Sequence, residues 1–239
     1  MSSTTLGGSP VFVLVHGAYH GGWCWDHLRP ELTRRGCAVL AVDLPIDHSA
    51  AGAEEYAAAV VTAVPAGAEP VVVVGHSLGG LTIPLLPALI PVKRLVFLCA
   101  LVPQPGLSFD EQHVDMDSGF VPSEAPQANP DGSASWPRAA AIEMFYHDCP
   151  LEIASWAAGR LRPQHWTITR EVTPLRSWPT TPMTSIVARE DRVVAPDYCR
   201  TQARDRLGVE SLEIDGGHSP FLSRPVELAD MLVRVAVGH

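Results

Sequence analysis

The chain alternates short, fully apolar runs with longer stretches of helical spacing. Six of the runs, most of them apolar at consecutive positions rather than at every second one, lie at Val11–Val15, Ala38–Val42, Val71–Val74, Arg94–Cys99, Thr184–Val187 and Ser211–Ile214. Strands that are apolar on both faces are typical of a parallel sheet buried between helices. The pattern therefore predicts six buried strands.

Helical stretches separate these runs, at about Cys24–Arg35, Ala53–Val64, Leu78–Leu89, Pro196–Leu207 and Pro225–Val237. Pro84 and Pro87 fit the third stretch badly, because a proline inside a helix removes a hydrogen bond and costs about 3 kcal/mol. We expect that helix to be kinked or shortened. Strands alternating with helices predict an α/β fold, a mostly parallel sheet covered by helices on both faces, with ligands bound beyond the carboxyl ends of the strands.

Residues 103–182 break this alternation, with many prolines and no clear sheet strand. Two parts of the segment, Trp136–Tyr146 and Pro150–Leu161, have helix-like spacing. A flexible linker would not carry six large aromatic residues, which are Phe120, Trp136, Phe145, Tyr146, Trp156 and Trp166. We predict that residues 103–182 form a helical cap inserted into a core of residues 1–102 and 183–239, and that the cap supplies an apolar pocket.

A candidate nucleophile follows the third predicted strand. The residues Gly75-His76-Ser77-Leu78-Gly79 spell G-x-S-x-G directly after four valines and before a helical stretch. In this pattern a serine is held on a strained turn, and the flanking glycines let strand and helix approach closely. The three fixed positions alone are a weak signal, but the order of strand, turn and helix favours a serine nucleophile over a loop without chemistry.

A base and a carboxylate for Ser77 are available later in the chain. Serine is a poor nucleophile until a histidine takes its proton, and a carboxylate orients that histidine. Asp191 and His218 each follow a predicted strand, so both are expected on the rim of the sheet where Ser77 lies. The chain order Ser, Asp, His is that of α/β hydrolases.

Two other carboxylates compete with Asp191. Glu190 precedes it, but the residues after Asp191 have the composition of a loop leading into the next helix, so we favour Asp191. Asp215 is nearer to His218 along the chain, yet it is better placed to cap a turn with Gly216.

An oxyanion needs donors that are already aimed at it, and backbone N–H groups meet this need. We expect them from Leu78, at the start of a helix whose dipole favours negative charge, and from Ala18, in the loop after the first strand. His16 in that loop could instead bind substrate, but a histidine directly after a buried strand more often bonds the backbone. Further residues expected in the substrate pocket are Gly17, Tyr19, Phe145 and Phe221.

Composition excludes several classes of partner. The net charge is −9 and no Lys/Arg cluster is present, which argues against nucleic acid and anionic membranes. Met1–Pro10 has neither a basic nor an apolar leader, and no apolar run could span a bilayer, so we expect a cytoplasmic protein. Five cysteines without a C-x-x-C pair and ten scattered histidines predict no disulfide framework, no metal and no cofactor. Nothing in the sequence predicts the oligomeric state.

The cap contains a second group of reactive side chains, His147, Asp148 and Cys149. Consecutive residues on a helix do not share a face. We therefore interpret the group as a polar part of the lid surface rather than as a second catalytic cluster.

Several segments together resemble the α/β-hydrolase superfamily, and more narrowly its branch of plant methylesterases, salicylate-binding esterases and hydroxynitrile lyases. They are Val13–Trp25, Gly75–Gly80, Asp191 and His218, and the similarity spans nearly the whole core but fades in the cap. The resemblance implies a cofactor-free enzyme that uses Ser77, Asp191 and His218 on small esters in a covered apolar pocket.

Two positions separate esterase from lyase. In the lyases of this branch a threonine follows the first-strand histidine and a lysine follows the catalytic histidine, whereas this chain has Gly17 and Ser219 there. Without an ammonium group, a departing cyanide would be difficult to stabilise. We predict a serine hydrolase of small carboxylic esters. A thioesterase or lactonase, and a binding protein without catalysis, stay as alternatives.

Overall fold

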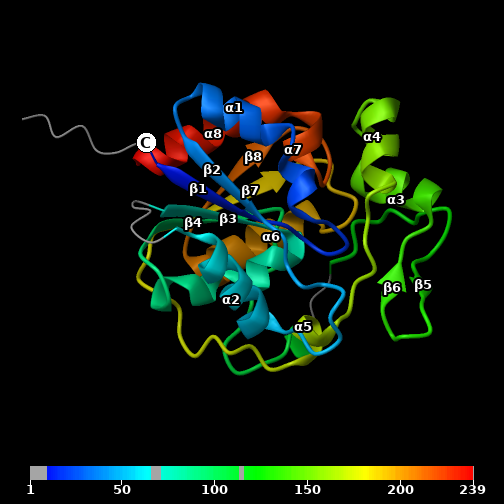
Figure 1. The fold of residues 1–239 in the computed structure, drawn as a ribbon, viewed down its shortest axis with the longest axis horizontal. Coiled ribbons are helices and arrows are strands. Elements are labelled where there is room, and N and C mark those ends of the chain that lie inside the picture. The colour runs from blue at the N-terminus through cyan, green and yellow to red at the C-terminus, as the bar shows by residue number, and fades with distance from the viewer. Residues whose placement is uncertain (1–9, 66–70, 113–115, 239) are drawn as a thin grey trace, which may run out of the picture.

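The computed structural model describes residues 10–65, 71–112 and 116–238. Six parallel strands form one sheet in the order β2-β1-β3-β4-β7-β8 (Figure 1). Their bounds are β1 Val11–Val15, β2 Ala38–Val42, β3 Val71–His76, β4 Val92–Leu98, β7 Met183–Ala188 and β8 Ser211–Ile214. All six predicted strands are confirmed. The prediction about a leader in Met1–Pro10 concerns residues that lie, apart from Pro10, outside the described ranges.

Helices cover both faces of this sheet. On one face α1 (Leu28–Arg34) and α8 (Pro225–Val237) share a buried cluster with Phe12 and Leu14 of β1. On the other face α2 (Ala53–Ala63) and α6 (Pro196–Gln202) share a second cluster with Val13 and Val15. Successive side chains of a strand point to opposite faces, so a strand covered on both faces must be apolar at every position. The predicted architecture is confirmed.

The stretch Leu78–Leu89 is interrupted, as Pro84 and Pro87 led us to expect, but it contains no α-helix. Two short 3₁₀ segments replace it, η2 (Ser77–Leu81) and η3 (Ile83–Ala88). Pro84 and Pro87 both lie in η3, where their missing N–H groups prevent a continuous α-helix. The macrodipole expected behind Leu78 is therefore absent from this turn, because a single 3₁₀ turn lacks the aligned peptides of a long helix.

Two other helices differ at their ends. The stretch Cys24–Arg35 divides into a 3₁₀ turn, η1 (Gly22–Trp25), and α1. The stretch Pro196–Leu207 ends in a π-helical turn, η5 (Ala203–Leu207), after α6. A short helix, α7 (Pro220–Ser223), precedes α8 and was not predicted.

Residues 103–182, here called the insertion, connect β4 to β7. In Figure 1, α3, α4, β5 and β6 of this segment lie beyond the carboxyl ends of the sheet strands. The described elements are η4 Asp110–Gln112, β5 Gln127–Ala128, β6 Ala134–Ser135, α3 Arg138–Phe145, α4 Leu151–Ala158 and α5 Thr167–Arg170. The two helices predicted at Trp136–Tyr146 and Pro150–Leu161 are confirmed as α3 and α4. The hairpin of β5 and β6 was missed because each strand has two residues, too few to show a period.

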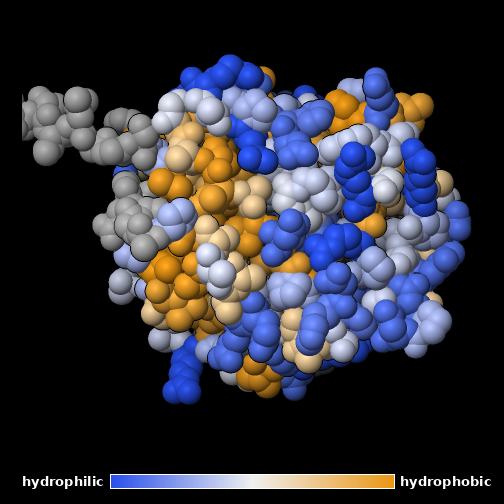
Figure 2. All heavy atoms as spheres, in the orientation of Figure 1, coloured by the Kyte–Doolittle hydropathy of each residue, from blue (hydrophilic) through white to orange (hydrophobic). Residues whose placement is uncertain are grey.

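The surface is unevenly polar. Figure 2 shows hydrophilic side chains over most of the right-hand part of this face, where the insertion lies, and hydrophobic side chains gathered at the left. No helix in the described ranges is long and apolar enough to cross a membrane. All five cysteines are free thiols, and all but Cys149 are buried.

Candidate active site

Ser77 lies on a strained turn at the carboxyl end of β3. Its φ is 51°, in the left-handed region that residues other than glycine rarely adopt. A Cβ on Gly75 would lie 2.8 Å from Ile83, and a Cβ on Gly79 would lie 2.8 Å from the carbonyl oxygen of His16. The glycine spacing of the motif is thus required by close packing around a strained serine, an arrangement typical of functional sites.

His218 is held by Asp191. Its Nδ1–H donates to Asp191 Oδ2 at 2.8 Å, and both side chains are only 1% exposed. The other carboxylate oxygen accepts from the N–H groups of Val193 at 2.8 Å and Val194 at 3.0 Å. Because both oxygens are engaged, the carboxylate cannot turn, and the imidazole keeps its proton on Nδ1 and presents Nε2 as an acceptor.

The two competing carboxylates lie elsewhere. Glu190 is exposed, and Asp215 is exposed and forms an ion pair with Arg189. Neither contacts His218. The structure therefore pairs the histidine with the carboxylate favoured by the sequence.

Ser77 and His218 line the same cavity. The backbone of His218 is tied to the strand that carries Ser77, because His76 Nε2–H donates to the His218 carbonyl oxygen at 2.9 Å and the two rings lie 4.5 Å apart. The side-chain hydrogen bond of His218 is with Asp191, and a direct bond to the Ser77 hydroxyl is absent among the described residues. Such bonds often tighten only when substrate is bound.

The loop after β1 lies directly against the nucleophile. A Cβ on Gly17 would be 2.7 Å from the Cβ of Ser77. Ala18 and Leu78, the two expected oxyanion donors, both line the cavity with Ser77. The structure thus brings together the two backbone segments from which an oxyanion hole was predicted.

His16 does not reach the cavity, because it is fully buried. Its Nδ1–H donates to the Gly17 carbonyl oxygen at 2.8 Å, and its Nε2 accepts from the N–H of Leu44 at 3.0 Å. The expectation that this histidine bonds the backbone is confirmed. His20 is similarly occupied, since Nδ1–H donates to the Ala18 carbonyl oxygen at 2.7 Å and Nε2 accepts from the Tyr146 hydroxyl at 2.8 Å.

Three imidazoles around the site are therefore buried and neutral. Burial lowers the pKa of His16 to about 4 and the pKa of His20 to about 3. Burial, helped by the neighbouring His218, also lowers the pKa of His76 well below its usual range. In each case the low-dielectric surroundings disfavour the charged form.

These depressed pKa values predict a loss of stability in mild acid. The unfolded chain binds protons near pH 6.5, while the folded chain does not until about pH 4 or below, so the free energy of unfolding falls as the pH drops from 6.5 to 4. His16 and His20 are each expected to remove about 2 kcal/mol between pH 7 and pH 5. Urea unfolding at both pH values measures this, and an unchanged midpoint would contradict it.

The cavity has a volume of about 410 Å³ and a mainly apolar wall. Its large aromatic residues are Tyr19, Phe109, Trp136, Phe145 and Trp166. The charged residues that line it are Asp110 and Arg170. A cavity of this size and polarity fits a small apolar organic molecule.

Two of the four predicted pocket residues line this cavity, Tyr19 and Phe145. Gly17 lies behind Ser77 rather than on the wall. The prediction that Phe221 lines the pocket is wrong, because its side chain is fully buried and its ring centroid lies 4.7 Å from that of Trp25. It belongs to α7, which turns its side chain into the core.

The sequence argument missed other lining residues, namely Phe109, Met116, Trp136, Trp166 and Arg170. These five belong to the insertion, whereas Leu101, Val193 and Val194, which also line the cavity and were not predicted, lie outside it. The density of aromatic residues in that segment was the available signal, but it could not assign individual positions.

His147 and Asp148 have a different place from the one expected. Asp148 Oδ2 accepts from the N–H of Gly217 at 2.9 Å, and a Cβ on Gly217 would overlap the His147 ring. The pair thus packs against the loop that leads into His218, and the interpretation as lid surface is wrong. Cys149 is half-buried, and no group of three or more metal-ligating side chains occurs in the described ranges.

Comparison with known proteins finds relatives along almost the whole chain. The chain is 30% identical to the α-hydroxynitrile lyase of Arabidopsis thaliana over 255 residues, covering 95% of this chain and 97% of that protein. It is also 30% identical to methylesterase 3 of Arabidopsis thaliana over 253 residues, covering 94% and 95%. The crystal structure of polyneuridine aldehyde esterase matches with a TM-score of 0.76 at 24% identity, covering 95% of this chain and 99% of that one.

These relatives confirm the resemblance to the plant esterase and lyase branch. The model of the alpha/beta hydrolase family matches residues 12–231, which include Ser77, Asp191 and His218. With its parallel sheet and its serine turn after β3, the chain belongs to the alpha/beta hydrolase family.

Proposed function

We propose that this chain is a serine hydrolase that cleaves small carboxylic esters through an acyl-enzyme. The observation that carries the proposal is the meeting of three distant segments at one cavity. Ser77 stands on a left-handed backbone at the end of β3, His218 lines the same cavity, and Asp191 holds His218 from behind. This is the arrangement needed to activate a hydroxyl group.

The proposed reaction begins with proton transfer. His218 Nε2 takes the Ser77 proton while the serine oxygen attacks the ester carbonyl carbon, and Asp191 stabilises the imidazolium that forms. The tetrahedral intermediate collapses as His218 gives the proton to the leaving alcohol. Water then attacks the acyl-enzyme with His218 as base. The bond between the acyl carbon and the Ser77 oxygen breaks, His218 returns the proton to Ser77, and the carboxylic acid leaves.

The negative charge of the tetrahedral oxygen needs preorganised donors. We assign this role to the N–H groups of Ala18 and Leu78, because both residues line the cavity beside Ser77. The short η2 turn supplies no macrodipole of consequence, so the two N–H groups themselves carry the stabilisation.

The insertion acts as the cap in this proposal. Its aromatic residues, among them Trp136, Phe145 and Trp166, form much of the cavity wall. The cap would exclude water from the reacting carbonyl and select apolar acyl or alkyl groups. We accordingly divide the chain into a core of residues 1–102 and 183–239 and a cap of residues 103–182.

Ester hydrolysis is favoured over cyanohydrin cleavage by the charges near the site. The chain has one lysine, Lys93, which is exposed near the amino end of β4. Ser77 lies at the opposite rim of the sheet, where the strands have their carboxyl ends. The residue after His218 is Ser219, a neutral side chain that is fully buried. No ammonium group is thus available beside the base to stabilise a departing cyanide.

A substrate panel tests this proposal. The purified protein is expected to hydrolyse p-nitrophenyl acetate, p-nitrophenyl butyrate and small aryl methyl esters, and to leave mandelonitrile uncleaved. Release of p-nitrophenol is followed by absorbance and release of benzaldehyde by chromatography. Cleavage of mandelonitrile with no ester turnover would contradict the proposal, while a preference for thioesters or lactones would keep the mechanism and change the substrate class.

A further inference from the structure

Tyr19 has an unusual backbone next to a proposed oxyanion donor. Its φ is 65°, in the left-handed region, and it directly follows Ala18. Apart from glycines, only Ser77 and Cys99 share a positive φ in the described ranges. A side-chain-bearing residue keeps such a conformation only when its surroundings impose it.

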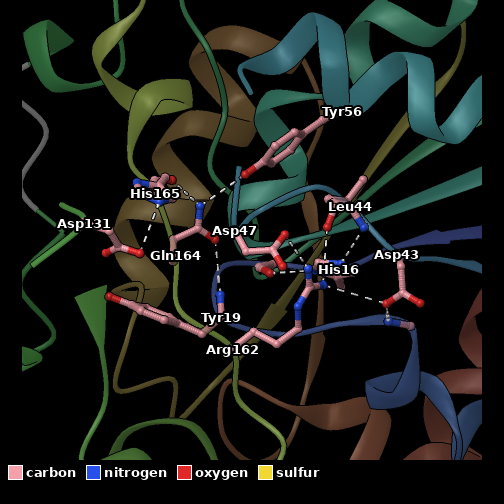
Figure 3. Close-up of polar contacts among 12 residues, drawn as sticks. His16, Tyr19, Asp43, Leu44, Asp47, Tyr56, Asp131, Arg162, Gln164 and His165 are labelled. Carbon is pink, nitrogen blue, oxygen red and sulfur yellow. Dashed lines mark hydrogen bonds and ion pairs between the residues drawn. The ribbon is translucent and has the colours of Figure 1, made fainter. Parts of the chain in front are cut away.

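Both backbone polar groups of Tyr19 are bonded to the cap. The N–H of Arg162 donates to the Tyr19 carbonyl oxygen at 2.7 Å, and the Tyr19 N–H donates to Gln164 Oε1 at 3.3 Å. Figure 3 shows Gln164 between Tyr19 and Tyr56, with the chain from Arg162 to His165 running past the loop. The cap segment thus holds both peptide groups that flank the Tyr19 Cα, in the loop after β1.

The amide of Gln164 is itself immobile. The side chain is fully buried, and its Nε2 donates to the Tyr56 hydroxyl at 3.1 Å and to the His165 carbonyl oxygen. Its backbone exchanges two hydrogen bonds with Ala134, at 3.0 and 2.9 Å. Because the His165 carbonyl requires a donor and the Tyr19 N–H an acceptor, the amide can adopt only one of its two orientations.

The same segment also ties down the loop after β2. The Arg162 guanidinium donates to the Leu44 carbonyl oxygen at 3.3 Å and to Asp47 at 2.9 Å (Figure 3). Leu44 in turn donates its N–H to His16, at the start of the loop that contains Tyr19. Gln164 is therefore the buried centre of a network that leaves the β1 loop little freedom.

We propose that Gln164 is a positioning residue for the oxyanion hole. It does not line the cavity. It acts by holding Tyr19 in the left-handed conformation, which aims the N–H of the preceding Ala18 at the oxygen that becomes charged during attack by Ser77. This inference rests on the proposed function, because it assigns a task within the same reaction.

Two substitutions separate this role from a general contribution to folding. Gln164→Leu removes the acceptor for the Tyr19 N–H and both donors. Gln164→Glu keeps a carbonyl oxygen for the Tyr19 N–H and, in the protonated form that burial favours, one O–H that can donate to the His165 carbonyl oxygen, while the donor to the Tyr56 hydroxyl is lost. We expect Q164L to lower kcat about 30- to 100-fold with KM changed less than threefold, and Q164E to stay within about fivefold of the wild type.

The affinity for an aryl trifluoromethyl ketone distinguishes a positioning role from a purely structural one, because a residue that only stabilises the fold would not change it. The ketone forms a charged tetrahedral adduct with the serine, so its affinity reports the oxyanion hole, while the product acid reports the ground state. In Q164L the affinity for the ketone is expected to fall by about the same factor as kcat, and the affinity for the product acid is expected to stay unchanged. Val60→Ala, a buried truncation in α2, is the matched control, since it lowers stability without touching the loop.

Hydrogen exchange provides a test that needs no activity. The Tyr19 amide is expected to be protected in the wild type and in Q164E, and to exchange at least tenfold faster in Q164L. If Q164L does not fold, Gln164→Asn serves instead, because its amide is one methylene too short to reach Tyr19.

The outcomes distinguish this inference from the proposed function. Equal kcat, ketone affinity and Tyr19 exchange in Q164L and the wild type would overturn the positioning role while ester turnover stands. Wild-type protein without ester turnover would overturn the function, and the exchange data would still decide whether Gln164 holds the loop.

Discussion

Replacing Ser77 by alanine is expected to lower kcat for p-nitrophenyl butyrate by about 10⁴-fold or more. The hydroxyl forms the covalent bond in the proposed reaction, and the alanine side chain has no group that can form it. Alanine suits the site sterically, and the left-handed backbone is no worse for alanine than for serine, so the fold is expected to persist. Steady-state turnover with unchanged circular dichroism measures the effect.

Ser219→Ala is the matched control for this substitution. Ser219 is also a buried serine, directly follows His218, and has a hydroxyl without a hydrogen-bond partner among the described residues. Its loss is expected to change kcat less than about fivefold. Turnover in S77A above a tenth of the wild-type value, or a larger loss in S219A than in S77A, would assign the nucleophile to another residue.

Replacing Asp191 by asparagine is expected to lower kcat about 10³- to 10⁴-fold with little change in KM. The carboxylate accepts from His218 Nδ1–H through one oxygen and from the Val193 and Val194 N–H groups through the other. In D191N the two backbone N–H groups retain the carbonyl oxygen, so the NH₂ group faces His218. The imidazole must then adopt the tautomer with its proton on Nε2 and its lone pair on Nδ1. In that tautomer Nε2 can no longer accept the Ser77 proton.

Glu190→Gln is the control for charge alone. Glu190 is the neighbouring carboxylate and is exposed, so its neutralisation is expected to leave kcat within about twofold. A D191N enzyme that retains more than a tenth of wild-type kcat, or an E190Q enzyme as impaired as D191N, would contradict the assigned role of Asp191.

The strands and the serine turn could be predicted because local chemistry decides them. Val71–Val74 can only be a strand buried on both faces, and Gly75 and Gly79 are the residues that permit close packing around Ser77. Asp191 and His218 were located by one further step, since residues that follow parallel strands meet at the same edge of the sheet.

The rest depends on contacts between distant segments. Phe221 and Phe145 are both aromatic, yet only packing decides that the first enters the core and the second lines the cavity. The prolines at 84 and 87 predicted an interruption of the stretch Leu78–Leu89, but not that only 3₁₀ segments would form there. Gln164 lies 145 residues from its partner Tyr19, so no local pattern could reveal its role.

The central claim is that the three segments activate the Ser77 hydroxyl, and covalent labelling tests it most directly. A fluorophosphonate reacts with a serine whose hydroxyl is activated by a neighbouring base, but not with an ordinary hydroxyl. Peptide mass spectrometry of the labelled protein is predicted to find one phosphonate, on Ser77, with labelling lost in S77A and slowed in D191N. Intact protein that stays unlabelled, or a label on any other residue, would contradict the account.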